Sequence, residues 1–212
     1  MFYDRYEAGR DLAEKLTEYE NTDAVICAIP RGGILIGVAV AKELKLPLEI
    51  MIVGTVEHVT QDASIYYAVT ETGTYACATD EPLPETEVTQ AIAEAKHKRL
   101  VYTDSAQLPN WKDKTVIVVD DGAESGLNIK AVVMTLQEQL PKKIIVAVPA
   151  APSSVIEWLE NQVDEVQVIK TEPEFTGIIQ EHYSHYPEVF DKEVNIAYRH
   201  AQHLYEHRSP TT

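Results

Sequence analysis

Two neighbouring aspartates followed by a short loop of small residues are the most chemically informative feature of this sequence. Asp120 and Asp121 directly follow the apolar run Thr115–Val119, and residues 122–126 separate them from an amphipathic pattern over residues 127–139. Successive β-branched residues are typical of a strand buried on both faces, and the later pattern is typical of a helix. The sequence therefore predicts a strand, a tight loop and a helix in this order.

The predicted loop has the chemistry of a phosphate site. Backbone N–H groups at the start of a helix have no partner within the helix, and the helix dipole is positive there. Ser125 and Asn128 would add side-chain donors. The two aspartates would repel a phosphate, but carboxylates suit sugar hydroxyls or a magnesium ion carried by the ligand. These residues indicate a phosphorylated sugar as the ligand.

A second loop with the same organisation lies closer to the N-terminus. Residues 24–29 predict a buried strand, and Pro-Arg-Gly-Gly at 30–33 leads into a predicted helix over residues 34–44. Glycines let backbone N–H groups approach an anion closely, and Arg31 could donate two hydrogen bonds to a pyrophosphate. Alone, the loop could equally serve helix packing, with Arg31 as a surface charge. Because open α/β sheets bind ligands at the carboxyl ends of their strands, the two loops together indicate one site.

Residues 118–126, Val-Val-Asp-Asp-Gly-Ala-Glu-Ser-Gly, resemble the phosphoribosyl-pyrophosphate (PRPP) signature of type I phosphoribosyltransferases, with Ser125 in place of the commoner threonine. The Pro-Arg-Gly-Gly loop resembles the pyrophosphate loop of the same family. Further segments match, in order, one subfamily of predicted phosphoribosyltransferases: Phe2-Tyr3-Asp4-Arg5 with Ala8-Gly9, Ala147-Val148-Pro149, and the tail from Phe175 to Tyr183.

The resemblance implies a role for each loop. Asp120 and Asp121 would face the ribose hydroxyls of PRPP, and magnesium would arrive with PRPP rather than in a dedicated protein site. The pyrophosphate would lie on Arg31, Gly32 and Gly33. The implied 5-phosphate cradle consists of Gly122, Ala123, Glu124, Ser125, Gly126, Leu127 and Asn128. The implied reaction transfers the 5-phosphoribosyl group to an unidentified nitrogenous base and releases pyrophosphate.

Three positions depart from the family pattern. Residues 53–57, Val-Gly-Thr-Val-Glu, stand where the subfamily usually has Arg-Lys and a glycine, and Thr103-Asp104 replace basic residues. Pyrophosphate binding would then depend heavily on Arg31. Glu124 stands where the 6-oxopurine salvage transferases have an acid beside the base, which implies a candidate catalytic acid or base. A solvent-facing loop residue is the alternative for Glu124.

Two other functions remain open at this point. The missing cations after Val53 also fit a non-catalytic regulatory protein that binds PRPP or a nucleotide and has lost turnover. Hydrolysis or transfer with a different phosphosugar is the other possibility. A receiver domain also has two aspartates at a strand end, but on its first strand, whereas this pair falls in the middle of the chain.

The elements around the two loops predict one α/β domain over residues 1–208, with a disordered tail at 209–212. We expect a parallel, doubly wound sheet of the type I phosphoribosyltransferase kind, with a β-hairpin and a small hood formed by the N-terminal segment and the C-terminal tail. Further expected helices cover residues 2–19, 85–102, 153–160 and 192–207; further strands cover 48–53, 143–148 and 165–169, and the hairpin covers 64–69 and 75–78.

Composition narrows the class of partner. The formal net charge of −16 and the lack of a compact basic stretch argue against nucleic acid. No apolar run is long enough to span a membrane and the N-terminus does not resemble a signal peptide, so we expect a cytoplasmic protein without a membrane partner. Two cysteines are too few for a disulfide framework. A homodimer is compatible with the sequence.

Overall fold

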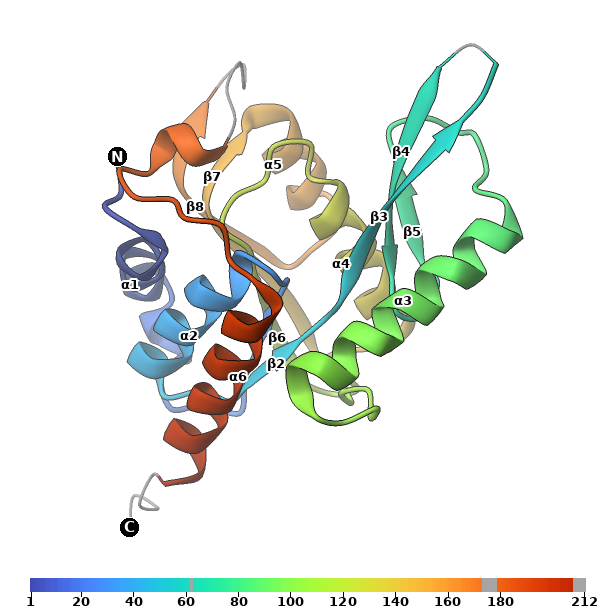
Figure 1. The fold of residues 1–212 in the computed structure, drawn as a ribbon. Helices are drawn as coiled ribbons and strands as arrows, with labels where there is room; N and C mark the ends of the chain where they lie inside the picture. Colours follow the sequence, from blue (N-terminus) through green and yellow to red (C-terminus); the bar gives the residue numbers. More distant parts are fainter. Residues whose placement is uncertain (62, 173–178, 208–212) are drawn as a thin grey trace.

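A five-stranded parallel sheet forms the centre of the molecule (Figure 1). The computed structural model describes residues 1–61, 63–172 and 179–207, so Phe175 and the expected tail at 209–212 lie outside the described residues. The strand order is β2-β1-β6-β7-β8. The strands are β1 Val25–Ala28, β2 Leu48–Ile50, β6 Thr115–Val119, β7 Lys143–Pro152 and β8 Glu165–Glu172. The predicted doubly wound fold is confirmed.

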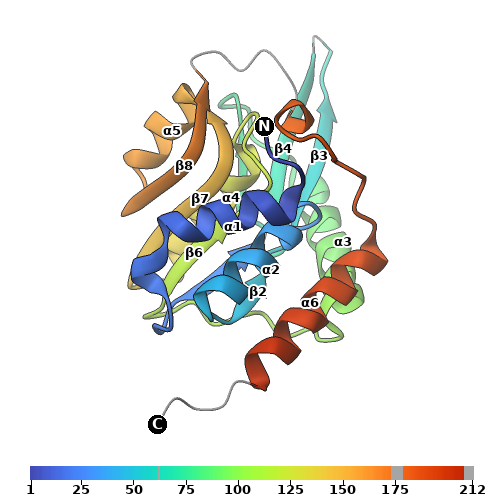
Figure 2. The same ribbon diagram turned by 90° about the vertical axis from the view of Figure 1, so that its left-hand side faces the viewer.

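Helices cover both faces of this sheet, as expected (Figure 2). Helices α1 (Arg5–Lys15) and α2 (Gly33–Leu44) lie on one face, and α4 (Leu127–Glu138) and α5 (Ser153–Glu160) lie on the other. Successive residues of β6 point alternately to the two faces: Ile117 and Val119 pack with α1 and α2, whereas Val116 and Val118 pack with α4 and α5. This double burial explains why β6 is apolar from Val116 to Val119.

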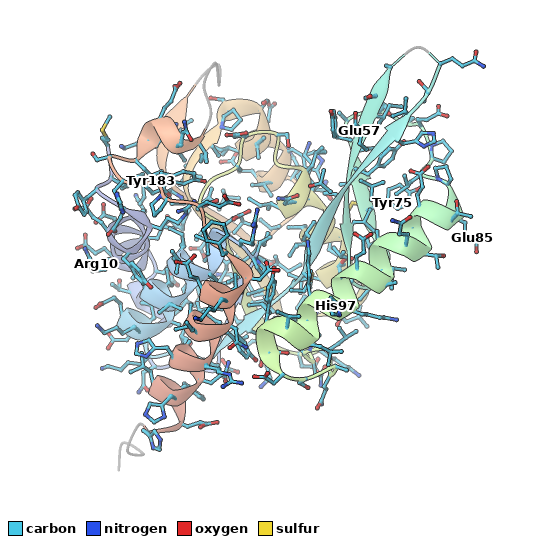
Figure 3. The ribbon with its side chains drawn as sticks, viewed as in Figure 1. Arg10, Glu57, Tyr75, Glu85, His97 and Tyr183 are labelled. Carbon is cyan, nitrogen blue, oxygen red and sulfur yellow. The ribbon has the colours of Figure 1, made fainter. Side chains whose placement is uncertain are left out.

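A second, antiparallel sheet stands beside the central one and projects beyond it (Figure 1). It consists of β3 (Val53–Val59), β4 (Ser64–Thr70) and β5 (Tyr75–Cys77), and α3 (Glu85–Thr103) packs on it. Figure 3 labels Tyr75, which lies on β5 and packs edge to face against Tyr67 at 5.8 Å between ring centroids. The predicted hairpin of β4 and β5 is confirmed. The prediction of one strand over residues 48–53 was wrong, because the chain leaves the central sheet after Ile50 and enters the second sheet at Val53.

A segment near the C-terminus forms a small hood, and the N-terminal residues are hydrogen-bonded to it. The Phe2 N–H donates to the His182 carbonyl at 2.7 Å, and the Ser184 N–H donates to the Phe2 carbonyl at 2.8 Å. The rings of Phe2 and Tyr183 lie 5.5 Å apart, centroid to centroid. We use the term hood for residues 179–189, which begin with the short helix η2 (Ile179–His182) and precede helix α6 (Asp191–Glu206). The predicted hood is confirmed.

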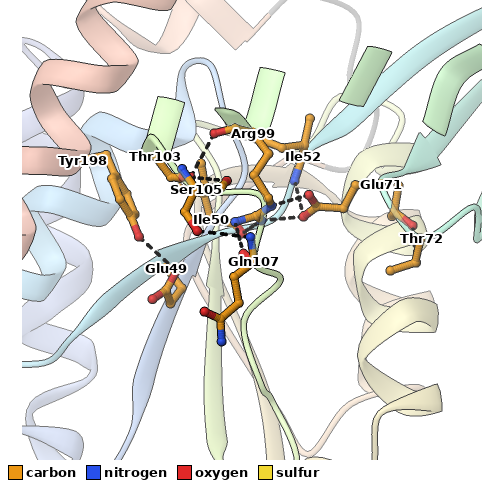
Figure 4. Close-up of polar contacts among 11 residues, drawn as sticks. Glu49, Ile50, Ile52, Glu71, Thr72, Arg99, Thr103, Ser105, Gln107 and Tyr198 are labelled. Carbon is orange, nitrogen blue, oxygen red and sulfur yellow. Dashed lines mark hydrogen bonds and ion pairs between the residues drawn. The ribbon is translucent and has the colours of Figure 1, made fainter. Parts of the chain in front are cut away.

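A buried ion pair joins the second sheet and α3 to the end of β2 (Figure 4). Arg99 and Glu71 pair with only 2% of each side chain exposed, and Arg99 Nη2 donates to the Ile50 carbonyl at 2.7 Å. The Glu71 backbone N–H donates to the Ile52 carbonyl at 3.1 Å. Burial opposes the charge of Arg99, but the hydrogen bonds and charge of Glu71 leave its pKa raised. The pair therefore fixes the point where the chain passes between the sheets.

Removing one member of this pair should strongly destabilise the fold. Arg99→Met leaves Glu71 buried without its partner, so we expect urea denaturation to show a loss of about 3–5 kcal/mol in unfolding free energy. Arg199→Met is the matched control, because Arg199 and Asp104 form an ion pair with 64% and 56% of their side chains exposed. The control should lose less than about 1 kcal/mol. Equal losses in the two variants would contradict the anchoring role of Arg99.

Candidate functional site

The two predicted loops follow neighbouring strands and meet at one edge of the sheet. Strands β1 and β6 are parallel, with Ala28 opposite Val119, and the Ile29 N–H donates to the Val119 carbonyl at 3.1 Å. The loop after β1 contains Arg31, and the loop after β6 begins with the acidic pair. Both loops therefore lie at the carboxyl ends of β1 and β6, where open α/β sheets bind ligands.

Glycine is needed where the first loop touches the acidic pair. A Cβ added at Gly32 would lie 1.9 Å from Asp121 Oδ2, and one added at Gly33 would lie 2.8 Å from Asp120 Oδ1. These distances are shorter than real side chains tolerate, so the backbone of this loop lies directly against the carboxylates. The Pro30–Arg31 peptide bond in the same loop is cis.

A cavity of about 630 Å³ opens where the loops meet, and the second sheet and the hood complete its walls. Every site residue predicted from the sequence lines it except Gly33, which is buried. The predicted residues on its wall are Arg31, Gly32, Asp120, Asp121, Gly122, Ala123, Glu124, Ser125, Gly126, Leu127 and Asn128. Residues without a predicted site role also line it, among them Arg5, Thr55, Tyr66, Gln180, Tyr186 and Glu188.

The second loop has the geometry of an anion cradle at the start of α4. Gly126 adopts the left-handed conformation with φ 69°, and Ser125 Oγ accepts a hydrogen bond from the Leu127 N–H at 3.4 Å. The remaining N–H groups of the first helical turn are free of intrahelical partners. The Ala123 N–H, however, donates to the Ala150 carbonyl at 3.0 Å, and Ala123 is buried. The Ala123 N–H is therefore not available to a ligand.

The two aspartates have different surroundings. Asp120 is buried, and its Oδ1 accepts a hydrogen bond from the Asp121 N–H at 2.8 Å. Burial raises the pKa of Asp120 well above its usual range, and the neighbouring charge of Asp121 adds to the effect. Asp121 Oδ2 accepts from Arg5 Nε at 2.7 Å and from the Tyr186 hydroxyl at 2.8 Å. One carboxylate is therefore poorly solvated, and the other is already paired.

The hood contacts each of the predicted binding segments. The Ile179 N–H donates to Glu124 Oε1, the Tyr183 hydroxyl donates to the Asp121 carbonyl at 2.7 Å, and Glu188 pairs with Arg31 at 3.2 Å. Figure 3 shows Tyr183 in the hood, near the N-terminal helix. Arg5 was not predicted as a site residue. The only sign in the sequence was its place in the matched N-terminal motif Phe-Tyr-Asp-Arg. Ile179 and Tyr183 also lie in a matched segment, the tail from Phe175 to Tyr183, whereas Tyr186 and Glu188 gave no such signal.

The charges of the cavity wall are mainly negative. Among the residues that the structure describes, four carboxylates line it, from Asp120, Asp121, Glu124 and Glu188, against the two guanidinium groups of Arg5 and Arg31. Each guanidinium pairs with one of these carboxylates. A polyanion would therefore depend on backbone N–H groups and an accompanying divalent cation. The carboxylate oxygens of the acidic pair are ligands that suit magnesium. In the described parts of the chain, no group of three or more His, Cys, Asp or Glu residues is arranged to hold a metal ion.

A doubly wound α/β domain with two loops after adjacent strands defines the class of this protein, and these loops lie where open α/β sheets bind ligands. The comparison with known families is more specific: the model of the phosphoribosyl transferase domain matches residues 2–184, and the chain belongs to this family. No helix among the described residues has the length and apolarity needed to cross a membrane.

Similar proteins agree with this assignment. A protein of Mycobacterium tuberculosis, provisionally named a phosphoribosyl transferase, is 25% identical over 203 residues, which cover 92% of this chain and 45% of the relative. The chain thus spans less than half the length of these curated relatives. The crystal structure of a Thermus thermophilus protein, TT1426, has a TM-score of 0.74 at 26% identity and covers 93% of this chain and 98% of that one. A hypothetical protein from Neisseria gonorrhoeae with bound ppGpp has a TM-score of 0.50 at 14% identity, over 97% and 95% of the two chains, which indicates the same fold.

The raised pKa of Asp120 predicts that this residue destabilises the folded protein at neutral pH. A carboxyl whose pKa rises on folding favours the folded state below its unfolded pKa of about 3.9, and this advantage is lost as pH increases through the folded pKa. Asp120→Asn keeps an acceptor oxygen but cannot ionise. We expect its melting temperature to exceed that of the wild type at pH 8, with the difference shrinking toward pH 4.

The matched control is Asp80→Asn, because Asp80 is exposed. The control should follow the wild type throughout the pH range in the same differential scanning calorimetry experiment. A melting temperature of Asp120→Asn that falls further below that of the wild type as pH rises from 4 to 8 would mean that the ionised carboxylate stabilises this fold.

Proposed function

We propose that this chain transfers the 5-phosphoribosyl group of PRPP to a nitrogenous base, with magnesium, and releases pyrophosphate. The observation that carries the proposal is the meeting of two glycine-containing loops, after adjacent strands, on one cavity that also contains a pair of aspartates. Such a cavity suits a ligand with a phosphate at one end, a pyrophosphate at the other and sugar hydroxyls between them. Membership of the phosphoribosyl transferase family supports the same ligand.

Each loop would hold one part of PRPP. The 5-phosphate would lie at the start of α4, where the first-turn N–H groups and Ser125 provide donors. The ribose hydroxyls would donate to Asp120 and Asp121. The pyrophosphate would lie on the loop of Gly32 and Gly33, with Arg31 as its cation. Magnesium bound with PRPP would neutralise part of the pyrophosphate charge.

The chemical step is a substitution at the ribose C1 carbon. The bond from C1 to the pyrophosphate oxygen breaks, its electron pair leaves with pyrophosphate, and the lone pair of a base nitrogen forms the new bond to C1. The base then gives up a proton. The protein contributes orientation and charge neutralisation. We propose Glu124 as the group that accepts this proton, since it lines the cavity and its Oε1 acts as an acceptor toward the Ile179 N–H.

A binding protein without turnover is the second candidate. The ion pair of Arg31 with Glu188 favours it, because the cation expected to bind pyrophosphate is already paired. Strand β3 provides no lysine or arginine in its place. Calorimetry with PRPP and magnesium, combined with a pyrophosphate-release assay over purine and pyrimidine bases, separates the candidates. Tight binding without release for any base would favour the binding protein.

Arg31→Gln should weaken PRPP binding while leaving the fold intact, because Arg31 is about half exposed. A hydrogen bond to a charged group contributes about 1.5–3 kcal/mol, so we expect calorimetry to show roughly 10-fold to 100-fold weaker binding. Arg10→Gln is the control, because Arg10 is an exposed residue of α1 outside the cavity (Figure 3). Unchanged affinity in Arg31→Gln would count against the pyrophosphate assignment.

The charges of the cavity predict the class of acceptor base. Both arginines on its wall are paired with carboxylates, and Arg31 is proposed to bind the pyrophosphate. A base that carries a carboxylate would therefore find no unpaired arginine or lysine among the described residues of the wall and would be repelled. In a pyrophosphate-release assay we expect turnover with uncharged bases and none with carboxylated pyrimidines or pyridines. A preference for a carboxylated base would contradict this account of the cavity.

A further inference from the structure

The Asp121 side chain accepts hydrogen bonds from two parts of the protein that are distant in the sequence. Its Oδ2 accepts from Arg5 Nε at 2.7 Å and from the Tyr186 hydroxyl at 2.8 Å. Arg5 is the first residue of α1, and Tyr186 belongs to the hood. One carboxylate oxygen therefore joins helix α1 and the hood to the loop after β6.

The three side chains form a closed and mostly buried cluster. The side chains of Arg5 and Asp121 are 6% and 13% exposed, and the guanidinium carbon of Arg5 lies 3.6 Å from the centroid of the Tyr186 ring. Arg5 Nη1 also donates to the Pro187 carbonyl at 2.7 Å. Stacking and hydrogen bonds together leave the guanidinium one orientation, and a planar guanidinium holds its partner more rigidly than an ammonium group would.

Within this cluster the two carboxylate oxygens of Asp121 have different partners. Arg5 and Tyr186 both donate to Oδ2, Asp121 lines the cavity, and its other side-chain hydrogen bond is with Asp120. A carboxylate can accept about four hydrogen bonds, so Oδ1 keeps acceptor capacity for a sugar hydroxyl.

The same cluster changes the potential in the cavity. Burial opposes the charge of Arg5, but the charge and hydrogen bond of Asp121 leave the pKa of Arg5 raised, so the guanidinium stays positive. Asp121 is thus neutralised at short range in a wall that has four carboxylates. An ion pair at this distance in a partly buried site is screened much less by salt than a surface pair.

We propose that Arg5 and Tyr186 are positioning residues that act through Asp121. They hold Oδ2 toward the protein so that Oδ1 faces the ligand, and Arg5 offsets a negative charge that would otherwise repel the anionic sugar phosphate. This inference rests on the proposed function, because its ligand is PRPP. It differs from that function in assigning the effect of Arg5 to Asp121 rather than to contact with PRPP.

A double-mutant cycle tests this indirect action. Calorimetry with PRPP and magnesium would compare the wild type with Arg5→Gln, Asp121→Asn and the double variant. Arg5→Gln should bind about tenfold more weakly or worse, because it removes a hydrogen bond to a charged group. The double variant should bind within about twofold of Asp121→Asn, since Arg5 has no carboxylate left to act on. Arg5→Lys, which keeps the charge, should recover part of the loss.

Tyr186→Phe and Tyr183→Phe form a matched pair in the hood. The Tyr186 hydroxyl donates to the Asp121 side chain, whereas the Tyr183 hydroxyl donates to the Asp121 backbone and Tyr183 does not line the cavity. We expect Tyr186→Phe to weaken PRPP binding severalfold and Tyr183→Phe to lower only the urea midpoint. Equal effects of the two variants on PRPP affinity would mean that the cluster has a purely structural role.

The outcomes separate this inference from the proposed function. A wild type that binds no PRPP would overturn both. A wild type that binds PRPP, together with an unaffected Arg5→Gln or with losses that add fully in the double variant, would overturn the role of Arg5 alone. Urea denaturation of every variant shows whether a lost affinity comes from a lost fold.

Discussion

The close contact between the loop of Gly32 and Gly33 and the carboxylates of Asp120 and Asp121 is the constraint on which the rest of the site depends. The contact exists because β1 and β6 pair in parallel and end at the same level of the sheet. A side chain at either glycine would push the loops apart. The shape of the cavity therefore follows from strand register and from the absence of two β-carbons.

Electrostatics makes this arrangement unfavourable and explains the surrounding contacts. Two adjacent carboxylates, one of them buried with a raised pKa, oppose folding when they are ionised. Arg5 and Tyr186 offset part of that repulsion at Asp121, and the Asp121 N–H satisfies an oxygen of Asp120. Carboxylates whose pKa values are shifted by burial and by a neighbouring charge occur often at functional sites.

The central sheet and both loops could be predicted because their signals are local. The double burial of β6 gives an unbroken apolar run, and the glycines and aspartates follow their strands directly in the sequence. The boundary at Ile50 could not be predicted, because no turn residue interrupts residues 48–53, and the buried pair of Arg99 and Glu71 beside this crossing joins residues that are far apart in the sequence. The hood contacts could not be predicted either: Tyr186 and Asp121 are 65 residues apart, and only tertiary structure brings them together.

A crystal structure of this protein with PRPP and magnesium would test the central claim most directly. The account predicts one PRPP molecule across the cavity, with its 5-phosphate at the start of α4, its ribose hydroxyls at the acidic pair and its pyrophosphate on the loop of Arg31. Density for PRPP elsewhere, or for a ligand that reaches only one of the two loops, would contradict it.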